Sequence, residues 1–362
     1  MVSIQNLEPV KDSTLNELGL YWVKETDCAI DKLIEVTTEE AEAYYEAANE
    51  LYDMYVDAAE YIIDNDLFFE LGIPFNIVDT IKKSWENDVH WHIYGAFKFA
   101  GGVAGKPIKL AGFDADTTSH IFEAAQLQWA ILQENDIDES QQFNEIYEKI
   151  SENFKRLITL DDGIDLFDER YDGWNILFSS LSNTKDESTT RLLQQMADEA
   201  GFSNEFSYLD DVLFDDESIC DKHSNKFEYW YKHKKWLDIA TDESELATTL
   251  ATIMKNQEAI IINPAYTLLF ESRGMLKILK DLYPDSPYLL DVSFDKKDGY
   301  IEKTVFGDTS EYNNFKKIYQ EIAPTLKDVH NSNYEAKVFF AYEACGLSFI
   351  KDNNDFVGHV MV

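Results

Sequence analysis

The amino-acid sequence predicts a mixed α/β fold, of the α+β kind, with a helical region near the N-terminus. Three observations favour this fold: a strand–helix–strand unit in the middle of the chain, two short strands around a glycine-rich loop, and amphipathic helical stretches around them. Hydrophobic residues make up 45% of the 362 residues and aromatic residues 14%, so the chain can bury a large core. A length prior of roughly 150 residues per domain indicates about two domains.

The first strong signal is a long helix that begins after Thr37. Thr37 and Glu40 have the spacing of a capping box, and apolar residues recur behind them at helical intervals. Two strands follow, over 89–98 and 108–113, and should form a hairpin around the glycine-rich loop 101–105. Because no Lys-Ser or Lys-Thr follows these glycines, they indicate a flexible turn instead of a phosphate-binding loop.

The middle of the chain contains the clearest alternation of elements. Residues 117–131 and 141–157 have amphipathic helical patterns, and a strand over 174–181, a helix over 188–200 and a strand over 205–209 follow. A crossover of this kind joins parallel strands, so it predicts an α/β layer. An acidic loop and two further helices are expected beyond it, over 210–217, 243–256 and 268–282.

The composition excludes one class of partner and favours others. With 69 acidic and 31 basic residues, the formal net charge is -38. Nucleic acid is a poor partner for such a chain, because lysine and arginine are needed to bind backbone phosphates. A polyamine or a basic protein surface would be attracted, although the same charge also suits a surface that is simply well solvated.

Cysteine usage and hydropathy predict the location. The three cysteines are widely spaced and odd in number, which indicates no disulfide framework or zinc site; they are Cys28, Cys220 and Cys345. Residues 1–20 lack the pattern of a signal peptide, and no apolar run approaches the ~18 residues of a membrane span. We therefore expect a cytoplasmic protein with no membrane partner.

Several segments resemble the signatures of one family. Residues 109–119 read Lys-Leu-Ala-Gly-Phe-Asp-Ala-Asp-Thr-Thr-Ser, and residues 122–129 read Phe-Glu-Ala-Ala-Gln-Leu-Gln-Trp. They are similar to K-L-L-E-Y-N-A-D-T-P-T and L-E-A-A-x-x-Q-W, the signature of glutathionylspermidine synthases. The similarity continues in the same order over shorter segments, which are 94–95, 142–149, 186–201, 343–347 and 356–359.

This resemblance implies an ATP-grasp fold with a preATP-grasp-like strand–helix–strand layer. It implies an N-terminal lead-in over 1–18, a helical and preATP-grasp-like region over 19–210, and an ATP-grasp-like region over 211–362. The implied reaction uses ATP and Mg²⁺ to activate a carboxylate of a small peptide such as glutathione as an acyl phosphate, which a polyamine such as spermidine then attacks. ATP and Mg²⁺ are therefore the cofactors of an active protein, and an inactive one needs none.

The residues aligned with the family's metal and phosphate groups are largely replaced. Ala96 stands where the family has an arginine. Lys98 and Gly112 stand at two metal-ligand positions, and only Asp114 keeps an oxygen ligand. Because an ammonium group repels a divalent cation, the resemblance implies a degenerate magnesium site.

Nucleotide and substrate positions are partly kept. The resemblance assigns Arg273 and Lys303 to nucleotide binding, whereas Thr267 replaces a family lysine. Glu123 equally suits a structural role between helix and strand layers. The residues that the resemblance assigns to substrate binding are Asp116, Thr117, Ser119 and Glu123.

Two other features indicate structural roles. His90 and His92 share one face of a predicted strand and could begin a zinc site, but no third or fourth ligand is evident, so a structural role is favoured. Asn144 and Cys345 are expected to pack in the interior, since no histidine near Cys345 in the sequence could activate its thiol.

Three functions stay open at this point. The favoured one is a pseudoenzyme, an ATP-grasp protein whose ligase reaction is lost or weakened and which acts by binding or assembly. The alternative is an active carboxylate–amine ligase in which Asp114, Asp116 and further carboxylates that the sequence does not identify hold Mg²⁺. A structural component of a larger complex is the third, and no motif supports it.

Overall fold

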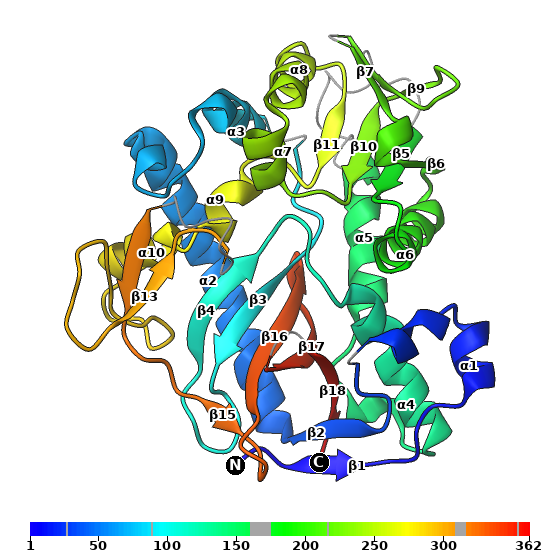
Figure 1. Cartoon of the computed structure of the whole chain (residues 1–362), viewed down its shortest axis with the longest axis vertical. Helices are drawn as coiled ribbons and strands as arrows, with labels where there is room; N and C mark the ends of the chain where they lie inside the picture. The colour runs from blue at the N-terminus through cyan, green and yellow to red at the C-terminus, as the bar shows by residue number, and fades with distance from the viewer. Residues whose placement is uncertain (27, 88–89, 160–174, 216, 308–315, 353–354) are drawn as a thin grey trace.

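The computed structural model describes residues 1–26, 28–87, 90–159, 175–215, 217–307, 316–352 and 355–362 (Figure 1). Within this part of the chain a mixed sheet of eight strands forms the centre of the molecule, in the order β1-β2-β18-β17-β16-β3-β4 with β15 beside β16. Strand β18 is parallel to β2 and antiparallel to β17, and the mixed α/β fold is confirmed. The strands are β1 (Ile4–Asn6), β2 (Lys32–Val36), β3 (Gly95–Ala100), β4 (Lys109–Asp114), β15 (Leu326–Lys327), β16 (Asn333–Ala341), β17 (Glu343–Lys351) and β18 (Asp355–Met361).

Helix α2 (Thr38–Asp64) covers one face of this sheet and lies behind it in Figure 1. The predicted capping box is confirmed: Thr37 Oγ1 accepts a hydrogen bond from the Glu40 amide (3.2 Å), and the Glu40 carboxylate accepts one from the Thr37 amide (3.1 Å). Tyr55 of α2 is fully buried and packs edge-on against Phe97 of β3. The apolar stripe of the helix thus forms the core on this side of the sheet.

Alternation along the strands gives the sheet two faces. Phe97 belongs to the core on the α2 side. Ala96 and Phe339 belong to a second core on the opposite side. Lys98 is two residues from Ala96 and Lys337 is two residues from Phe339, so both lysines project from the face away from α2.

A second sheet, in the order β11-β10-β5-β6, contains the predicted crossover unit. β5 and β6 are parallel and are joined by α6, which confirms the prediction. The helix begins where the Asn183 side chain accepts a hydrogen bond from the Asp186 amide (3.0 Å), and it ends at Gly201, whose φ is +109°. The elements are β5 (Asn175–Ser180), α6 (Thr184–Ala200), β6 (Ser203–Tyr208), β10 (Tyr229–Lys232) and β11 (Ile260–Ile262).

The other elements surround these two sheets (Figure 1). None of the described helices is both long enough and apolar enough to cross a membrane. The helices are α1 (Asp12–Glu17), α3 (Val78–Glu86), the π-helical turn Glu123–Leu127, α4 (Gln128–Glu134), α5 (Ile146–Thr159), α7 (Trp236–Asp242), α8 (Ser244–Lys255), α9 (Thr267–Glu271) and α10 (Gly274–Leu282). Two small sheets consist of β7 (Leu213–Asp215), β8 (Ser218–Cys220) and β9 (Lys226–Phe227), and of β12 (Val292–Ser293), β13 (Ile301–Thr304) and β14 (Lys317–Gln320).

Three element predictions were wrong. The strand expected over 89–98 is β3, which begins only at Gly95, and residues 91–94 form no regular element. The helix expected over 268–282 is split into α9 and α10, because Ser272 has an extended backbone and its hydroxyl donates a hydrogen bond to the Leu71 carbonyl oxygen (2.7 Å). The acidic stretch 210–217 is only partly a loop, since residues 213–215 form β7 and pair with β8. The division of the chain at residues 18 and 210 stays a prediction.

The glycine-rich loop between β3 and β4 is a tight turn against α2. Gly102 has φ +97°, and a Cβ atom there would lie 2.2 Å from the ring of Tyr44. The hydroxyl of Tyr44 donates a hydrogen bond to the Gly101 carbonyl oxygen (2.5 Å). The positive φ and the close packing on a buried tyrosine explain why position 102 is a glycine. The loop is therefore a structural turn in the described fold.

Candidate active site

The pairing of β3 with β4 brings together the positions aligned with the family's metal site. Ala96 lies opposite Asp114, and Lys98 lies opposite Gly112. On the other side of β3, Lys337 of β16 lies directly opposite Lys98. The site therefore contains a second lysine that none of the sequence motifs predicts.

The carboxylate that remains at this site is paired with ammonium groups. Lys98 Nζ lies 2.9 Å from Asp114 Oδ2, and Lys337 Nζ lies 3.9 Å from the same oxygen. Burial acts to raise the pKa of Asp114, but Lys98, Lys337 and Lys235 outweigh it and hold the pKa below its ordinary value. Asp114 is thus an anion whose charge is already balanced by the protein.

Lys337 is fully buried and is held by Ser119. Its Nζ donates hydrogen bonds to the carbonyl oxygen (2.8 Å) and the hydroxyl oxygen (2.9 Å) of Ser119. Burial lowers the pKa of Lys337 to about 7, with Lys98 acting in the same direction and Asp114 opposing it. Ser119, a predicted substrate residue, therefore lies at the site but bonds to one of its lysines.

Asp116 and Lys232 form a fully buried ion pair next to this site. Lys232 Nζ lies 2.8 Å and 2.9 Å from the two carboxylate oxygens, and the Trp236 amide donates to Oδ2 at 2.7 Å. The pair joins the segment after β4 to the end of β10. Both oxygens of Asp116, a predicted substrate residue, are thus bonded within the protein.

The side chain of Asn263 holds the segments around Asp116 in place, a structural role that the sequence did not predict. Its side chain accepts a hydrogen bond from the Ile93 amide (2.8 Å). It also donates to the carbonyl oxygens of Tyr94 (2.9 Å), Ala115 (3.1 Å) and Asp116 (2.8 Å). These bonds join the residue after β11 to segments beside β3 and β4, and only the three-dimensional structure brings these segments together.

Glu123 lies at the start of the π-helical turn and is fully buried. Lys185 Nζ lies 3.1 Å from its Oε1, and Cys28 Sγ lies 4.0 Å from the same oxygen. Its Oε2 has no hydrogen-bond partner among the described residues. Glu123 therefore keeps a buried acceptor open, and π-bulges often occur at functional sites. Thr117, the fourth predicted substrate residue, is half-buried.

A further pair of charged residues lies near Asp116. Lys235 Nζ is 3.7 Å from Glu271 Oε1. Burial raises the pKa of Glu271 to about 7; Lys235 opposes this shift, and the carboxylates of Asp116 and Asp114 add to it. Neither residue was predicted to belong to the site, although Glu271 lies two residues before Arg273.

The two predicted nucleotide residues have partners within the protein. The Arg273 guanidinium donates to the carbonyl oxygens of Thr304 (3.1 Å) and Gly307 (2.8 Å), and Lys303 Nζ donates to Gln320 Oε1 (2.9 Å). They support the small sheet that contains β13 and β14. Their role in nucleotide binding stays a prediction.

The residues present do not fit a magnesium centre of the family type. Mg²⁺ needs oxygen ligands in near-octahedral geometry. Lys98 and Gly112 supply none, and the Asp114 carboxylate already has ammonium partners. No group of three or more His, Cys, Asp or Glu side chains suited to a metal occurs among the residues that the structure describes.

Residues predicted to be structural lie in the interior. His92 Nε2 is 2.9 Å from the Ala115 carbonyl oxygen and its Nδ1 is 3.2 Å from the Tyr52 hydroxyl, and burial lowers its pKa to about 4. His90 and Cys345 are buried as well. Asn144 is only half-buried, and it donates a hydrogen bond to the Ala124 carbonyl oxygen (2.9 Å).

Comparison with known proteins identifies what the chain resembles. The family model described as "Glutathionylspermidine synthase preATP-grasp" matches residues 2–361. A Haemophilus influenzae protein named "Putative acid--amine ligase" is 27% identical over 270 residues, which make up 72% of this chain and 63% of that protein. The matched region thus spans less than two thirds of that relative's length.

The fold has a counterpart among solved structures. A glutathione synthetase-like effector from Globodera pallida, in its apo form, matches with a TM-score of 0.58 at 10% identity, covering 97% of this chain and 98% of that one. At this identity the likeness shows the fold alone, and it confirms the predicted ATP-grasp-like architecture. Because the family model spans nearly the whole chain, the protein belongs to the glutathionylspermidine synthase family.

Proposed function

We propose that this protein is a pseudoenzyme of its family: an ATP-grasp protein whose ligase reaction is lost or greatly weakened, and which acts by binding or assembly. One observation carries the proposal. The ammonium group of Lys98 lies 2.9 Å from Asp114 Oδ2, at a position where the family resemblance expects two metal ligands. The ion pair occupies the carboxylate that a metal ion would need.

The chemistry of phosphoryl transfer explains why a lysine in place of a metal ligand should weaken the reaction. A divalent ion bridges phosphate oxygens and neutralises the charge that develops during transfer. An ammonium group carries a single charge and cannot coordinate two oxygens as a metal does. Ala96 leaves the arginine position without a guanidinium, so this loss has no compensation on β3.

The surface charge supports a cationic partner, such as a polyamine or a basic protein. The net charge is -38, and the outer face of α2 carries exposed carboxylates along its whole length. Like charges at this spacing destabilise an isolated helix, and a cationic partner would relieve the repulsion. The exposed residues are Glu39, Glu42, Glu46, Glu50, Asp53, Asp57, Glu60 and Asp64.

The second candidate is an active ATP- and Mg²⁺-dependent ligase that joins a peptide carboxylate to an amine. Family membership and the name of the Haemophilus influenzae relative favour it. It requires Lys98 to leave Asp114 when Mg²⁺ and ATP bind. We also propose a cytoplasmic location, which three free cysteine thiols support.

Calorimetry and a turnover assay separate the two candidates. ATP is titrated with and without Mg²⁺, and phosphate release is then measured with glutathione and spermidine. The pseudoenzyme proposal expects no Mg²⁺-dependent gain in ATP affinity and no phosphate release above the blank. Phosphate release that Asp114→Ala abolishes, while the exposed-site variant Asp295→Ala keeps it, would establish the ligase instead.

A further inference from the structure

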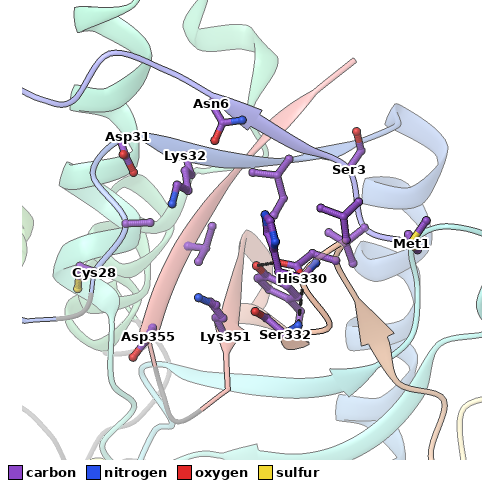
Figure 2. Close-up of a pocket in the computed structure, with 17 residues that line it drawn as sticks. Met1, Ser3, Asn6, Cys28, Asp31, Lys32, His330, Ser332, Lys351 and Asp355 are labelled. Carbon is purple, nitrogen blue, oxygen red and sulfur yellow. Dashed lines mark hydrogen bonds between the residues drawn. The ribbon is translucent and has the colours of Figure 1, made fainter.

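A cavity of about 810 Å³ lies at the end of the central sheet formed by β1, β2, β18 and the end of β17 (Figure 2). The turn between β15 and β16 closes one side of it. Small-molecule sites in proteins commonly have volumes of this size. None of the aligned metal-site positions lines it.

Strand alternation places this cavity on the other face of the sheet from the candidate active site. Lys32 lies two residues before Ile34, and Lys351 lies two residues after Phe349. Both Ile34 and Phe349 belong to the core on the α2 side. Lys98 lies two residues after Ala96, which belongs to the core on the opposite face of the sheet. The cavity is therefore not an extension of the candidate active site.

Two lysines supply the cationic groups of the cavity. Figure 2 shows Lys32 and Lys351 pointing into it from opposing walls, with Lys32 on β2 and Lys351 at the end of β17. Among the described residues neither ammonium group has an ion-pair or hydrogen-bond partner. In contrast, Lys98 and Lys232 are each paired with a carboxylate. Unpaired ammonium groups facing one hollow favour an anionic ligand.

The turn between β15 and β16, which lines the cavity, is held in place by Asp328. Its carboxylate accepts hydrogen bonds from the amides of His330 (2.8 Å) and Ser332 (3.0 Å) and from the hydroxyl of Tyr334 (3.0 Å). These bonds satisfy the negative charge of Asp328 and fix the turn. His330 and Ser332 therefore lie at the cavity on a preorganised segment (Figure 2).

We propose that this cavity binds a small molecule through an anionic group, a phosphate or a carboxylate, held between Lys32 and Lys351. Asp31 and Asp355 lie on the same walls and would repel a large polyanion, which favours a small ligand with one such group. The site is independent of the ligase chemistry and of the pseudoenzyme proposal.

Titration calorimetry of the full chain with inorganic phosphate, and separately with succinate, tests the proposal. The titrations use about 0.15 M salt, which screens the long-range repulsion by a net charge of -38. We expect at least one of the two anions to bind the native protein. Lys32→Gln and Lys351→Gln should each raise the Kd of that anion about tenfold. Phosphate binding alone would identify a phosphorylated ligand, and succinate binding alone a carboxylic acid.

The control variant is Lys255→Gln at the exposed end of α8, which lies outside the cavity lining. It should bind the anion as the native protein does, and thermal unfolding should show that all three variants are folded. Two results overturn the proposal: neither anion binds the native protein, or Lys255→Gln weakens binding as much as the cavity variants do.

Discussion

Lys98 and Lys337 lie directly opposite each other on two antiparallel strands, with the carboxylate of Asp114 within 3.9 Å of both ammonium groups. Like charges opposite each other on a sheet repel, and Asp114 offsets part of that repulsion. The burial of Lys337 adds a desolvation cost. Two lysines thus lie beside one carboxylate in a chain of net charge -38.

Restoring the oxygen ligands should restore metal binding. In the double variant Lys98→Asp/Gly112→Glu, two carboxylates replace an ammonium group and a glycine beside Asp114. We expect Mn²⁺, used as a spectroscopic probe for Mg²⁺, to bind at least about tenfold more tightly than to the native protein. Electron paramagnetic resonance measures the free Mn²⁺. The single variant Lys98→Ala serves as the control, and equal binding by both variants would contradict the prediction.

Lys337 should make stability depend on pH above neutrality. Its pKa is lowered to about 7 in the folded protein from an ordinary value of 10.5. Between these values the unfolded chain binds the extra proton, so the contribution of this residue to stability rises with pH by about 1.4 kcal/mol per pH unit. Urea unfolding of native protein and Lys337→Met from pH 6 to 10 should show their difference growing in favour of the native protein. A constant difference would rule out the lowered pKa.

The buried pair of Asp116 and Lys232 should be costly to break. Lys232→Met leaves a buried carboxylate without its cation, and we expect a loss of about 3–5 kcal/mol in the free energy of unfolding. The matched control is Lys226→Met, which removes a partly exposed pair with Glu258 (3.3 Å) and should cost less than about 1 kcal/mol. Urea unfolding measures both losses. Similar losses in the two variants would contradict the prediction that the buried pair is the more costly one to break.

Two glycines of the β3–β4 turn allow the cost of close packing to be compared with the cost of backbone strain. Gly102 and Gly105 both have positive φ, but only at Gly102 would a Cβ atom meet Tyr44, at 2.2 Å. Gly105→Ala should cost about 1 kcal/mol from strain alone. Gly102→Ala should cost at least about 2 kcal/mol more, because the tyrosine or the turn must move. Equal melting temperatures for the two variants would show that Tyr44 adapts freely.

Much of the fold could be predicted from local sequence patterns. The β5-α6-β6 crossover has strong periodicity and a glycine at the helix end, and the capping box at Thr37 is a short-range signal. The helix over 268–282 was predicted as one piece because its apolar spacing continues through Ser272. The break depends on a hydrogen bond to Leu71, about two hundred residues earlier in the chain, and a local pattern carries no information about it.

The site was predictable only where it follows a matched motif. The pairing of Lys98 with Gly112 and of Ala96 with Asp114 follows from a hairpin and an alignment. Lys337 was missed because it meets Lys98 only through the register of β16, far along the chain. Lys232 was missed for the same reason, since its contact with Asp116 joins two different sheets.

The position of β18 between β2 and β17 has a consequence for biosynthesis. The ribosome releases β2 early, yet its neighbour in the sheet is made only with residues 355–361. Until β18 is made, the edges of β2 and β17 that it covers stay unpaired, and such edges can pair with other chains. Nascent chains should therefore depend on chaperone protection until translation reaches this strand, and a stop codon before Asp355 should yield aggregated product.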